Sequence, residues 1–312
     1  MHSLEKILVI GASGQMGAEL TLALRHRYGG SQVIAADIQA APPILAGTGK
    51  FVHLNVLNKD SLLTTIKVHN IRQIYLLAAM LSATGELHPQ AAWDLNMKGL
   101  LNVLELSQQL NLTRVFWPSS IAALSPASTV YGISKCAGEL WCQYYHAKFG
   151  LDVRSIRYPG LISYQAPPGG GTTDYAIDIF HAAVKKKHYR CFLKKDTALP
   201  MLYMPDAIRA TLQLMTTPAE KIHTRTAYNV AGMSFTPAEL FDKIRRFAPE
   251  FTISYEPDHR QTIAESWPAQ VDDEAARRDW GWTPAYELTL MTNDMLVNLE
   301  KMHEHSRPVC TT

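Results

Sequence analysis

The sequence predicts an α/β protein with a doubly wound parallel sheet and a smaller C-terminal α/β lobe. One observation is a short apolar run, Lys6–Ile10, that leads directly into a glycine-rich turn. A second is the alternation of apolar runs with helical stretches over roughly 150 residues, which is typical of a parallel sheet covered by helices on both faces. The third is that this alternation ends beyond Pro159-Gly160, where a loop-rich stretch follows.

The first strand is expected to be buried on both faces, because the residues that follow Lys6 are all apolar. The turn Gly11-Ala12-Ser13-Gly14-Gln15-Met16-Gly17 comes next, and then a helical stretch over 18–27. Strand, glycine turn and helix in this order predict a dinucleotide site with the pyrophosphate at the helix N-terminus. A second strand, 32–36, ends at Asp37, where a carboxylate can bind an adenosine ribose and repel a 2′-phosphate. The sequence therefore predicts a Rossmann domain that prefers NAD to NADP.

Further strands and helices alternate along the chain. We expect strands over 51–54, 73–77, 114–117 and 152–157, and helices over 59–69, 91–110 and 131–149. Ligands of such sheets bind beyond the carboxyl ends of the strands. Five residues lie at those ends: Gly14, Asp37, Ala79, Ser120 and Tyr158.

The C-terminal part predicts a second, smaller lobe. It holds helical stretches over 174–184 and 205–215, a strand-like stretch over 189–193, and a helix start at Thr236-Pro237-Ala238-Glu239. A short strand, a Trp-bearing loop and a final helix follow over 252–299. We therefore place a cofactor-binding domain at 1–163 and a substrate-binding lobe, partly interwoven with it, at 164–312.

A catalytic pair is predicted by Tyr131 and Lys135, which lie one helical turn apart on one face. A phenol ionises near pH 10, so it is a poor base at neutral pH unless a neighbouring cation lowers its pKa. The pair could then take a proton from an alcohol while another group takes the hydride. Tyr-x-x-x-Lys also occurs by chance on many amphipathic helices, and it is the position beside the predicted strand ends that favours the catalytic interpretation.

Composition excludes several classes of function. The net charge of the 312-residue chain is +2 and 19% of its residues are charged, without a basic tract, so nothing points to nucleic acid or a membrane surface. No His, Cys, Asp or Glu cluster has the spacing of metal ligands, and the four cysteines show no disulfide-rich pattern. The N-terminus leads straight into a strand, so we expect a cytoplasmic protein with no leader segment.

These motifs resemble the short-chain dehydrogenase/reductase superfamily in its extended, nucleotide-sugar-epimerase-like form. The residues that carry this resemblance are the glycine turn, Asp37, Ser120 and Tyr131-x-x-x-Lys135. More narrowly, the segments 81–86, 131–139, 157–163, 169–175, 199–204 and 258–267 look like the short-chain type of L-threonine 3-dehydrogenase. The resemblance extends over nearly the whole chain, from Ile7 to Leu299.

The resemblance implies oxidation of the 3-hydroxyl of L-threonine by NAD to L-2-amino-3-oxobutyrate, without a metal, in a homodimer that packs through the helices 91–110 and 131–149. It implies catalysis by Tyr131, Lys135 and Ser120, with Ser119 as the adjacent candidate. The implied cofactor-binding residues are Gly11, Gly14, Gln15, Met16, Gly17, Asp37, Ile38, Asn55, Val56, Leu77, Ala78, Ala79, Asn96, Tyr131, Lys135, Tyr158 and Leu161. The implied substrate-binding residues are Ser82, Thr84, Ser120, Tyr131, Gly171, Thr172, Thr173 and Trp267.

Two departures from the family pattern stand out. The segment between Ser120 and Tyr131 is shorter than usual and borders the substrate pocket, and Asn55 replaces a common Asp near the adenine. Two other functions also use this fold. A nucleotide-sugar epimerase or dehydratase would need a cleft for uridine and diphosphate, where this chain has Gly-Gly-Gly-Thr-Thr. A dinucleotide-sensing regulator would be expected to lack the base, and here Tyr131, Lys135 and Ser120 are all present.

Overall fold

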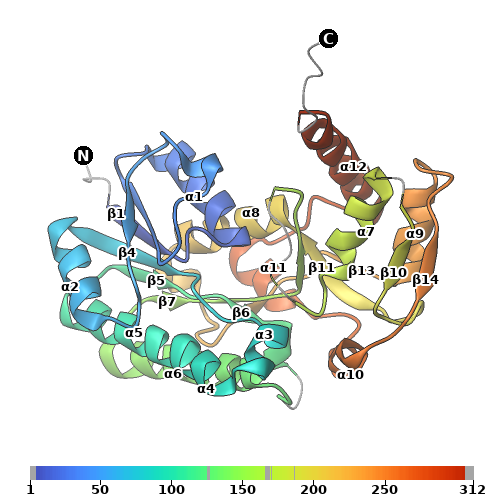
Figure 1. Cartoon of the computed structure of the whole chain (residues 1–312). Coiled ribbons are helices and arrows are strands. Elements are labelled where there is room, and N and C mark those ends of the chain that lie inside the picture. Colours follow the sequence, from blue (N-terminus) through green and yellow to red (C-terminus); the bar gives the residue numbers. More distant parts are fainter. Residues whose placement is uncertain (1–4, 125–126, 166–168, 170, 186, 306–312) are drawn as a thin grey trace, which may run out of the picture.

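A six-stranded parallel sheet forms the centre of the first lobe in a computed structural model of the chain (Figure 1). The structure describes residues 5–305 except 125–126, 166–168, 170 and 186. The sheet order is β3-β2-β1-β4-β5-β7, and every neighbouring pair is parallel. The strands are β1 (Lys6–Ile10), β2 (Val33–Asp37), β3 (Phe51–His53), β4 (Ile71–Leu76), β5 (Arg114–Phe116) and β7 (Val153–Arg154). The predicted α/β fold with a doubly wound parallel sheet is confirmed.

Helices cover both faces of this sheet. Successive residues of a strand point to opposite faces, so Ile7 and Val9 share one core with α1 and α8, whereas Leu8 and Ile10 share another with α2, α5 and α6. Figure 1 shows these two layers on either side of the sheet. The bounds are α1 (Gln15–Tyr28), α2 (Lys59–Val68), α5 (Gly99–Gln109), α6 (Val130–Phe149) and α8 (Met204–Thr216).

The predicted strand 152–157 is divided between two sheets. Trp117 still donates its N–H to the carbonyl of Arg154 at 3.0 Å, but Pro118 has no N–H and cannot extend the ladder of β5. The chain then forms β6 (Ser119–Ser120), which pairs with β8 (Ile156–Tyr158), and β8 pairs with β12 (Tyr228–Asn229). Ser120 is thus carried by a short sheet of its own at the edge of the first lobe.

The predicted helix over 91–110 is present but not uniform. It is formed by α4 (Pro89–Trp93), a π-helical turn at Asp94–Lys98 and α5, and it is preceded by α3 (Ser82–Leu87). The π-helical turn carries Asn96. Short 3-10 turns lie at Pro43–Leu45, Ile121–Ala123 and Ala219–Lys221.

The second lobe has its own core, seen at the right of Figure 1. Its strands form two small sheets, β9 (Gly160–Ile162) with β11 (Leu199–Tyr203) and β13 (Met233–Phe235), and β10 (Tyr189–Cys191) with β14 (Ile253–Tyr255). Its helices are α7 (Tyr175–Val184), α9 (Pro237–Arg245), α10 (His259–Glu265) and α12 (Leu288–His305). The predicted start of α9 is confirmed, because Thr236 and Glu239 form a reciprocal capping box.

The chain returns to the first lobe after entering the second. Buried residues of α8, of β12 and of α11 (Glu274–Trp280) pack in the same core as β1 and α1. The two lobes are therefore interwoven, and the division at 163/164 stays a prediction. Among the described residues, none of the helices combines the length and the apolar character that crossing a membrane requires.

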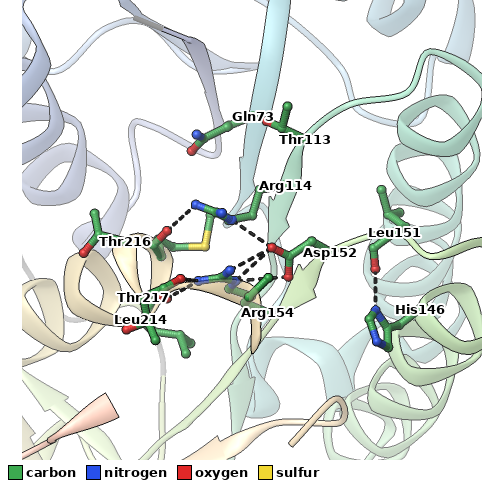
Figure 2. Close-up of polar contacts among 12 residues, drawn as sticks. Gln73, Thr113, Arg114, His146, Leu151, Asp152, Arg154, Leu214, Thr216 and Thr217 are labelled. Carbon is green, nitrogen blue, oxygen red and sulfur yellow. Dashed lines mark hydrogen bonds and ion pairs between the residues drawn. The ribbon is translucent and has the colours of Figure 1, made fainter. Parts of the chain in front are cut away.

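A buried cluster of charges ties α8 to the central sheet (Figure 2). Asp152 accepts hydrogen bonds from Arg114 at 3.0 Å, from Arg154 at 2.8 Å and from Arg225 at 2.9 Å. The guanidinium of Arg154 also donates to the carbonyls of Leu214 and Thr217 at the end of α8. Burial alone would raise the pKa of Asp152, but Arg154 and Arg114 outweigh it and lower that pKa to about 2.

We predict that Asp152→Asn lowers the free energy of unfolding by about 3 kcal/mol at pH 7, because it leaves buried guanidinium groups without their carboxylate. A carboxyl whose folded-state pKa is depressed stabilises the fold above its unfolded pKa, about 3.8, and loses this effect as the pH falls toward 2. Urea unfolding at several pH values should therefore show the two proteins converging below pH 4. Asp242→Asn, in an exposed ion pair, is the control and should have little effect at any pH. A difference of the same size at pH 3 and pH 7 would contradict this role of Asp152.

Candidate active site

The glycine turn brings the N-terminus of α1 against the end of β4. Gly11 has a φ of +88°, and a Cβ at this position would lie 2.4 Å from the nitrogen of Ala78. A Cβ on Gly17 would lie 2.0 Å from the carbonyl oxygen of Gly11, so both positions require glycine. Gly14 occupies the N-cap of α1 without a side chain that could cap the helix. The first turn of α1 is therefore free of a side-chain cap and suited to an anion.

Asp37 lies directly beside this turn. Its carboxylate accepts the N–H of Ser13 at 2.9 Å and that of Gln39 at 3.0 Å. Ile38 next to it is exposed, whereas the amide nitrogen of Gln15 is buried and has no hydrogen-bond partner within the described residues. Buried polar groups are normally paired, so an unpaired amide donor in the turn fits a ligand with oxygen acceptors. The residues present thus fit a nicotinamide dinucleotide.

The other predicted cofactor-binding residues differ in how far they are buried and in what they contact. Leu77, Ala78 and Ala79 are half-buried just beyond β4, and Leu161 is half-buried in β9. Val56 is buried, Met16 packs at the edge of the first core, and the amide oxygen of Asn55 accepts the N–H of Leu57 at 3.0 Å.

Tyr158 and Asn96 are already occupied by contacts within the chain. The ring of Tyr158 packs in the core and its hydroxyl bonds to Thr211, and the prediction that Tyr158 lies against the cofactor stays a prediction. Asn96 accepts the N–H of Met80 at 2.8 Å and donates to the Met80 carbonyl at 3.1 Å and to Ser134 at 3.2 Å. It thereby fastens the segment after β4 to α6.

Ser120 lies close enough to Tyr131 for its hydroxyl to lower the pKa of the phenol, and the Lys135 ammonium lies beside the Tyr131 ring. Ser120 also caps the 3-10 turn that follows it by accepting the N–H of Ala122 at 3.2 Å. The ammonium of Lys135 donates to the carbonyl of Pro118 at 2.6 Å and lies 5.3 Å from the centre of the Tyr131 ring. The adjacent Ser119 points elsewhere and donates to Glu139 at 2.5 Å. Of the two serines, Ser120 is therefore the one beside the phenol.

Burial acts on both members of the pair in a way that the sequence did not predict. It raises the pKa of Tyr131 to about 12, although the hydrogen bond from Ser120 lowers it. It lowers the pKa of Lys135 to about 7, against the opposing effects of Cys142 and Glu139. In this structure burial outweighs the expected lowering of the Tyr131 pKa, and the effect of Lys135 on the phenolate stays a prediction.

The predicted substrate residues come from three segments. Ser82 is buried and Thr84 exposed on α3, which is held to α6 by the N–H of Val130 donating to Glu86 at 2.8 Å. Gly169 lies against Leu81, and Thr173 packs on Gly160. These contacts join the glycine-rich loop to α3 and to the start of β9, and they join α3 to α6.

Thr172 and Trp267 have different surroundings. Thr172 is 1% exposed, and its hydroxyl has no hydrogen-bond partner within the described residues. The N–H of Gly171 donates to Asp174 at 2.6 Å and so fixes the loop just before Thr172. Trp267 is half-buried and packs on the core of the second lobe. Its place at the substrate stays a prediction.

The segment before the glycine-rich loop is fastened to α1. Ser163 donates to Glu19 at 2.5 Å and accepts the N–H of Gln165 at 3.0 Å. Burial raises the pKa of Glu19 to about 7, and the hydrogen bond from Ser163 lowers it. The helix that begins at the cofactor turn thus also holds the start of the predicted substrate loop.

One residue that the sequence interpretation missed is Glu139, which is 5% exposed and bonded to Ser119 and Arg157. The sequence spacing could have indicated that Glu139 lies near the pair, because it follows Lys135 by one helical turn on the face that carries Tyr131. Across the described ranges, no group of three or more His, Cys, Asp or Glu side chains could hold a metal ion.

Comparison with known proteins agrees with this geometry. A sequence model of the NAD dependent epimerase/dehydratase family matches residues 7–231. The structure of a GalE-like L-threonine dehydrogenase from Cupriavidus necator, in a holo form, is 56% identical with a TM-score of 0.92, over 94% of this chain and 99% of that one. A monomeric L-threonine 3-dehydrogenase from a metagenome is 41% identical with a TM-score of 0.91, over 95% and 99%. An uncharacterized epimerase/dehydratase from Staphylococcus epidermidis is 43% identical over 96% of this chain and 98% of that protein.

We predict that Thr172→Val leaves the free energy of unfolding within about 0.5 kcal/mol of wild type, because the lost hydroxyl has no partner in the described chain. Thr211→Val is the matched control. The Thr211 hydroxyl donates to Ala207 at 2.7 Å and bonds to Tyr158, so its loss should cost about 1–3 kcal/mol. Equal losses in urea unfolding would mean that Thr172 serves the fold and is not free for a ligand.

Proposed function

This chain belongs to the NAD dependent epimerase/dehydratase family, and we propose that within it the protein is an NAD-dependent L-threonine 3-dehydrogenase. It oxidises the 3-hydroxyl of L-threonine to give L-2-amino-3-oxobutyrate, a step in the breakdown of threonine toward glycine or aminoacetone. The observation that carries the proposal is the gathering of Tyr131, Ser120 and the buried Lys135 at one place, where the Lys135 ammonium lies 5.3 Å from the centre of the Tyr131 ring and bonds to the carbonyl of Pro118. High identity to an L-threonine dehydrogenase over nearly the whole chain supports the choice of substrate.

The oxidation removes one hydride from C3 of threonine and one proton from its hydroxyl. NAD supplies the hydride acceptor when it is bound. Tyr131 takes the proton, and Ser120 donates a hydrogen bond to the same oxygen as it becomes a carbonyl. Since burial holds the pKa of Tyr131 near 12, the neutral phenol dominates at pH 7, and turnover should rise with pH until Lys135, whose pKa is about 7, loses its proton. A protonated Lys135 favours the phenolate and can hold ribose hydroxyls with its remaining N–H groups.

The cofactor is NAD rather than NADP. Asp37 holds a carboxylate next to the turn, where it would bind ribose hydroxyls and repel a 2′-phosphate. Its two oxygens accept the backbone N–H groups of Ser13 and Gln39, and no salt bridge joins it to a cationic side chain in the described part of the chain. An added phosphate would therefore meet an uncompensated negative charge.

The amino acid is held by α3 and by the loop before α7. Ser82 and the hydroxyl of Thr172, with Thr84, Gly171 and Thr173, offer hydroxyl and backbone donors to the carboxylate of threonine. The unpaired Thr172 hydroxyl supports this assignment. No metal takes part in the proposed reaction, and nothing in it requires nucleic acid or a membrane.

The second candidate is a nucleotide-sugar epimerase or dehydratase, because the family and a curated relative carry that description. Both chemistries begin with proton removal by a tyrosine and hydride transfer to NAD. They differ in the outcome, since an epimerase returns the hydride to its substrate whereas a dehydrogenase releases NADH. The substrate and the net reduction of NAD therefore distinguish the two functions.

We place the protein in the cytoplasm and expect a homodimer. The three described cysteines, Cys136, Cys142 and Cys191, are free thiols, as is usual in a reducing compartment. The dimer is supported by an exposed apolar stripe on α6, formed by Ile133, Leu140, Trp141 and Tyr144. The opposite face of the same helix, with Gly138 and Cys142, is buried, so the apolar stripe is the face of α6 that the chain itself leaves uncovered. A second copy of the chain would cover it.

The proposal is tested by measuring NADH formation from NAD and purified protein. L-threonine should give NADH, whereas UDP-glucose, UDP-galactose and L-serine, run beside it, should give little or none. Conversion of a UDP-sugar without net NADH would move the protein to the epimerases.

We predict that Tyr131→Phe retains NAD binding and lowers kcat for L-threonine by roughly 100-fold or more, because the base is lost and the ring remains. Calorimetry with NAD and steady-state kinetics would measure the two effects. Tyr145→Phe on the same helix is the control and should keep its turnover. A Tyr131→Phe variant with near-wild-type kcat would remove Tyr131 from the role of base.

We predict that Leu140→Glu converts the protein from a dimer to a monomer, because it places a charge on the exposed stripe of α6. Sedimentation velocity gives the mass directly. Val68→Glu, at an equally exposed apolar position on α2, should remain dimeric. Since one relative is described as monomeric, a wild-type monomer is the outcome that would contradict the dimer.

A further inference from the structure

We propose that Glu139 is a positioning residue, which holds the Pro118–Ser120 segment in register with Tyr131 and Lys135. This inference rests on the proposed function of the site. Tyr131, Lys135 and Glu139 follow one another every four residues along one face of α6. Each of them contacts one residue of the Pro118–Ser120 segment. Along α6, Glu139 is the one of the three that lies farthest from the Tyr131 phenol.

The three contacts form a consecutive series. Tyr131 lies beside Ser120, whose hydroxyl lowers its pKa. Lys135 donates to the carbonyl of Pro118 at 2.6 Å, and Glu139 accepts the hydroxyl of Ser119 at 2.5 Å. Because β6 is only two residues long, its ladder alone gives little restraint. Side-chain contacts from α6 must therefore fix where Ser120 lies relative to the phenol.

Glu139 is itself held from the far side. Arg157 donates to both of its carboxylate oxygens, at 2.7 Å and 2.5 Å, and Arg157 is the β8 residue that pairs with Ser119. Arg157 also donates to the side-chain oxygen of Asn229 at 3.2 Å, and the side-chain amide of Asn229 donates to the carbonyl of Asp272 at 2.8 Å. Such a two-oxygen contact with a guanidinium fixes the orientation of the carboxylate as well as its position. The network thus extends from Ser119 to the segment before α11.

The charge of Glu139 also acts on Lys135. The groups around that ammonium are Tyr131, Cys142 and Glu139 from α6, and the ring of Trp117 and the carbonyl of Pro118 from the segment after β5. Of these only Glu139 brings a full negative charge at neutral pH, and it raises the pKa of Lys135 against the effect of burial. Arg157 offsets part of that charge from the side of β8. Loss of the carboxylate should therefore make Lys135 deprotonate at a lower pH.

A purely structural ion pair would affect stability alone. A positioning role affects the reaction, because a displacement of about 1 Å at a reacting group can cost roughly 100-fold in rate. We expect Glu139→Gln to lower kcat for L-threonine at least 10-fold with KM changed less than threefold, and to shift the alkaline limb of the kcat profile toward lower pH. Ser119→Ala removes the anchored hydroxyl and keeps the ion pair, so its kcat should fall severalfold without the pH shift.

The control is Asp152→Asn, which breaks a buried ion pair at the other end of the strands and should lose stability with an unchanged kcat. Glu139→Asp should restore the pH profile in part, since it restores the charge. If Glu139→Gln and Ser119→Ala both keep wild-type kcat and pH profiles, the inference is overturned. If the wild type converts a nucleotide sugar instead of threonine, the proposed function fails, and the same comparison of variants on that substrate tests Glu139.

Discussion

The close packing of α6 on the segment after β5 is the constraint on which the site depends. Gly138 lies so near to Trp117 that a Cβ there would meet the indole ring at 2.3 Å. This approach brings the face with Tyr131 and Lys135 against Pro118 and Ser120, and it buries Lys135 fully and Tyr131 in part. The burial that places the groups also opposes their charged forms, so the same contact determines the geometry and the proton affinity of the site.

The interwoven lobes follow from the same edge of the sheet. Pro118 ends the ladder of β5, and the chain continues in β6, whose partner β8 leads directly into β9 and the loop before α7. Ser163 then fastens this region to α1 through Glu19. The glycine turn, β6 and the glycine-rich loop before α7 are thus joined through short connections. The lobes stay together because α8 and α11 return to pack in the first core.

Most of the fold and the main chemical groups could be predicted from the sequence, because they depend on local patterns. The glycine turn, Asp37 and the Tyr131–Lys135 spacing each follow from neighbouring residues, and the structure gathers them at one edge of the sheet. Sequence reasoning missed what depends on contacts between distant segments. The division of strand 152–157 between two sheets, the burial that raises the pKa of Tyr131, and the pairing of Glu139 with Ser119 and Arg157 are of this kind.

The most direct test of the proposed reaction is the fate of the hydrogen on C3 of threonine. L-threonine deuterated at C3 would be incubated with the protein and NAD, and the reduced cofactor examined by mass spectrometry. The account predicts one deuterium in each NADH formed, together with slower hydride transfer than from the unlabelled substrate. Unlabelled NADH, or unchanged threonine with no reduced cofactor, would contradict oxidation at C3.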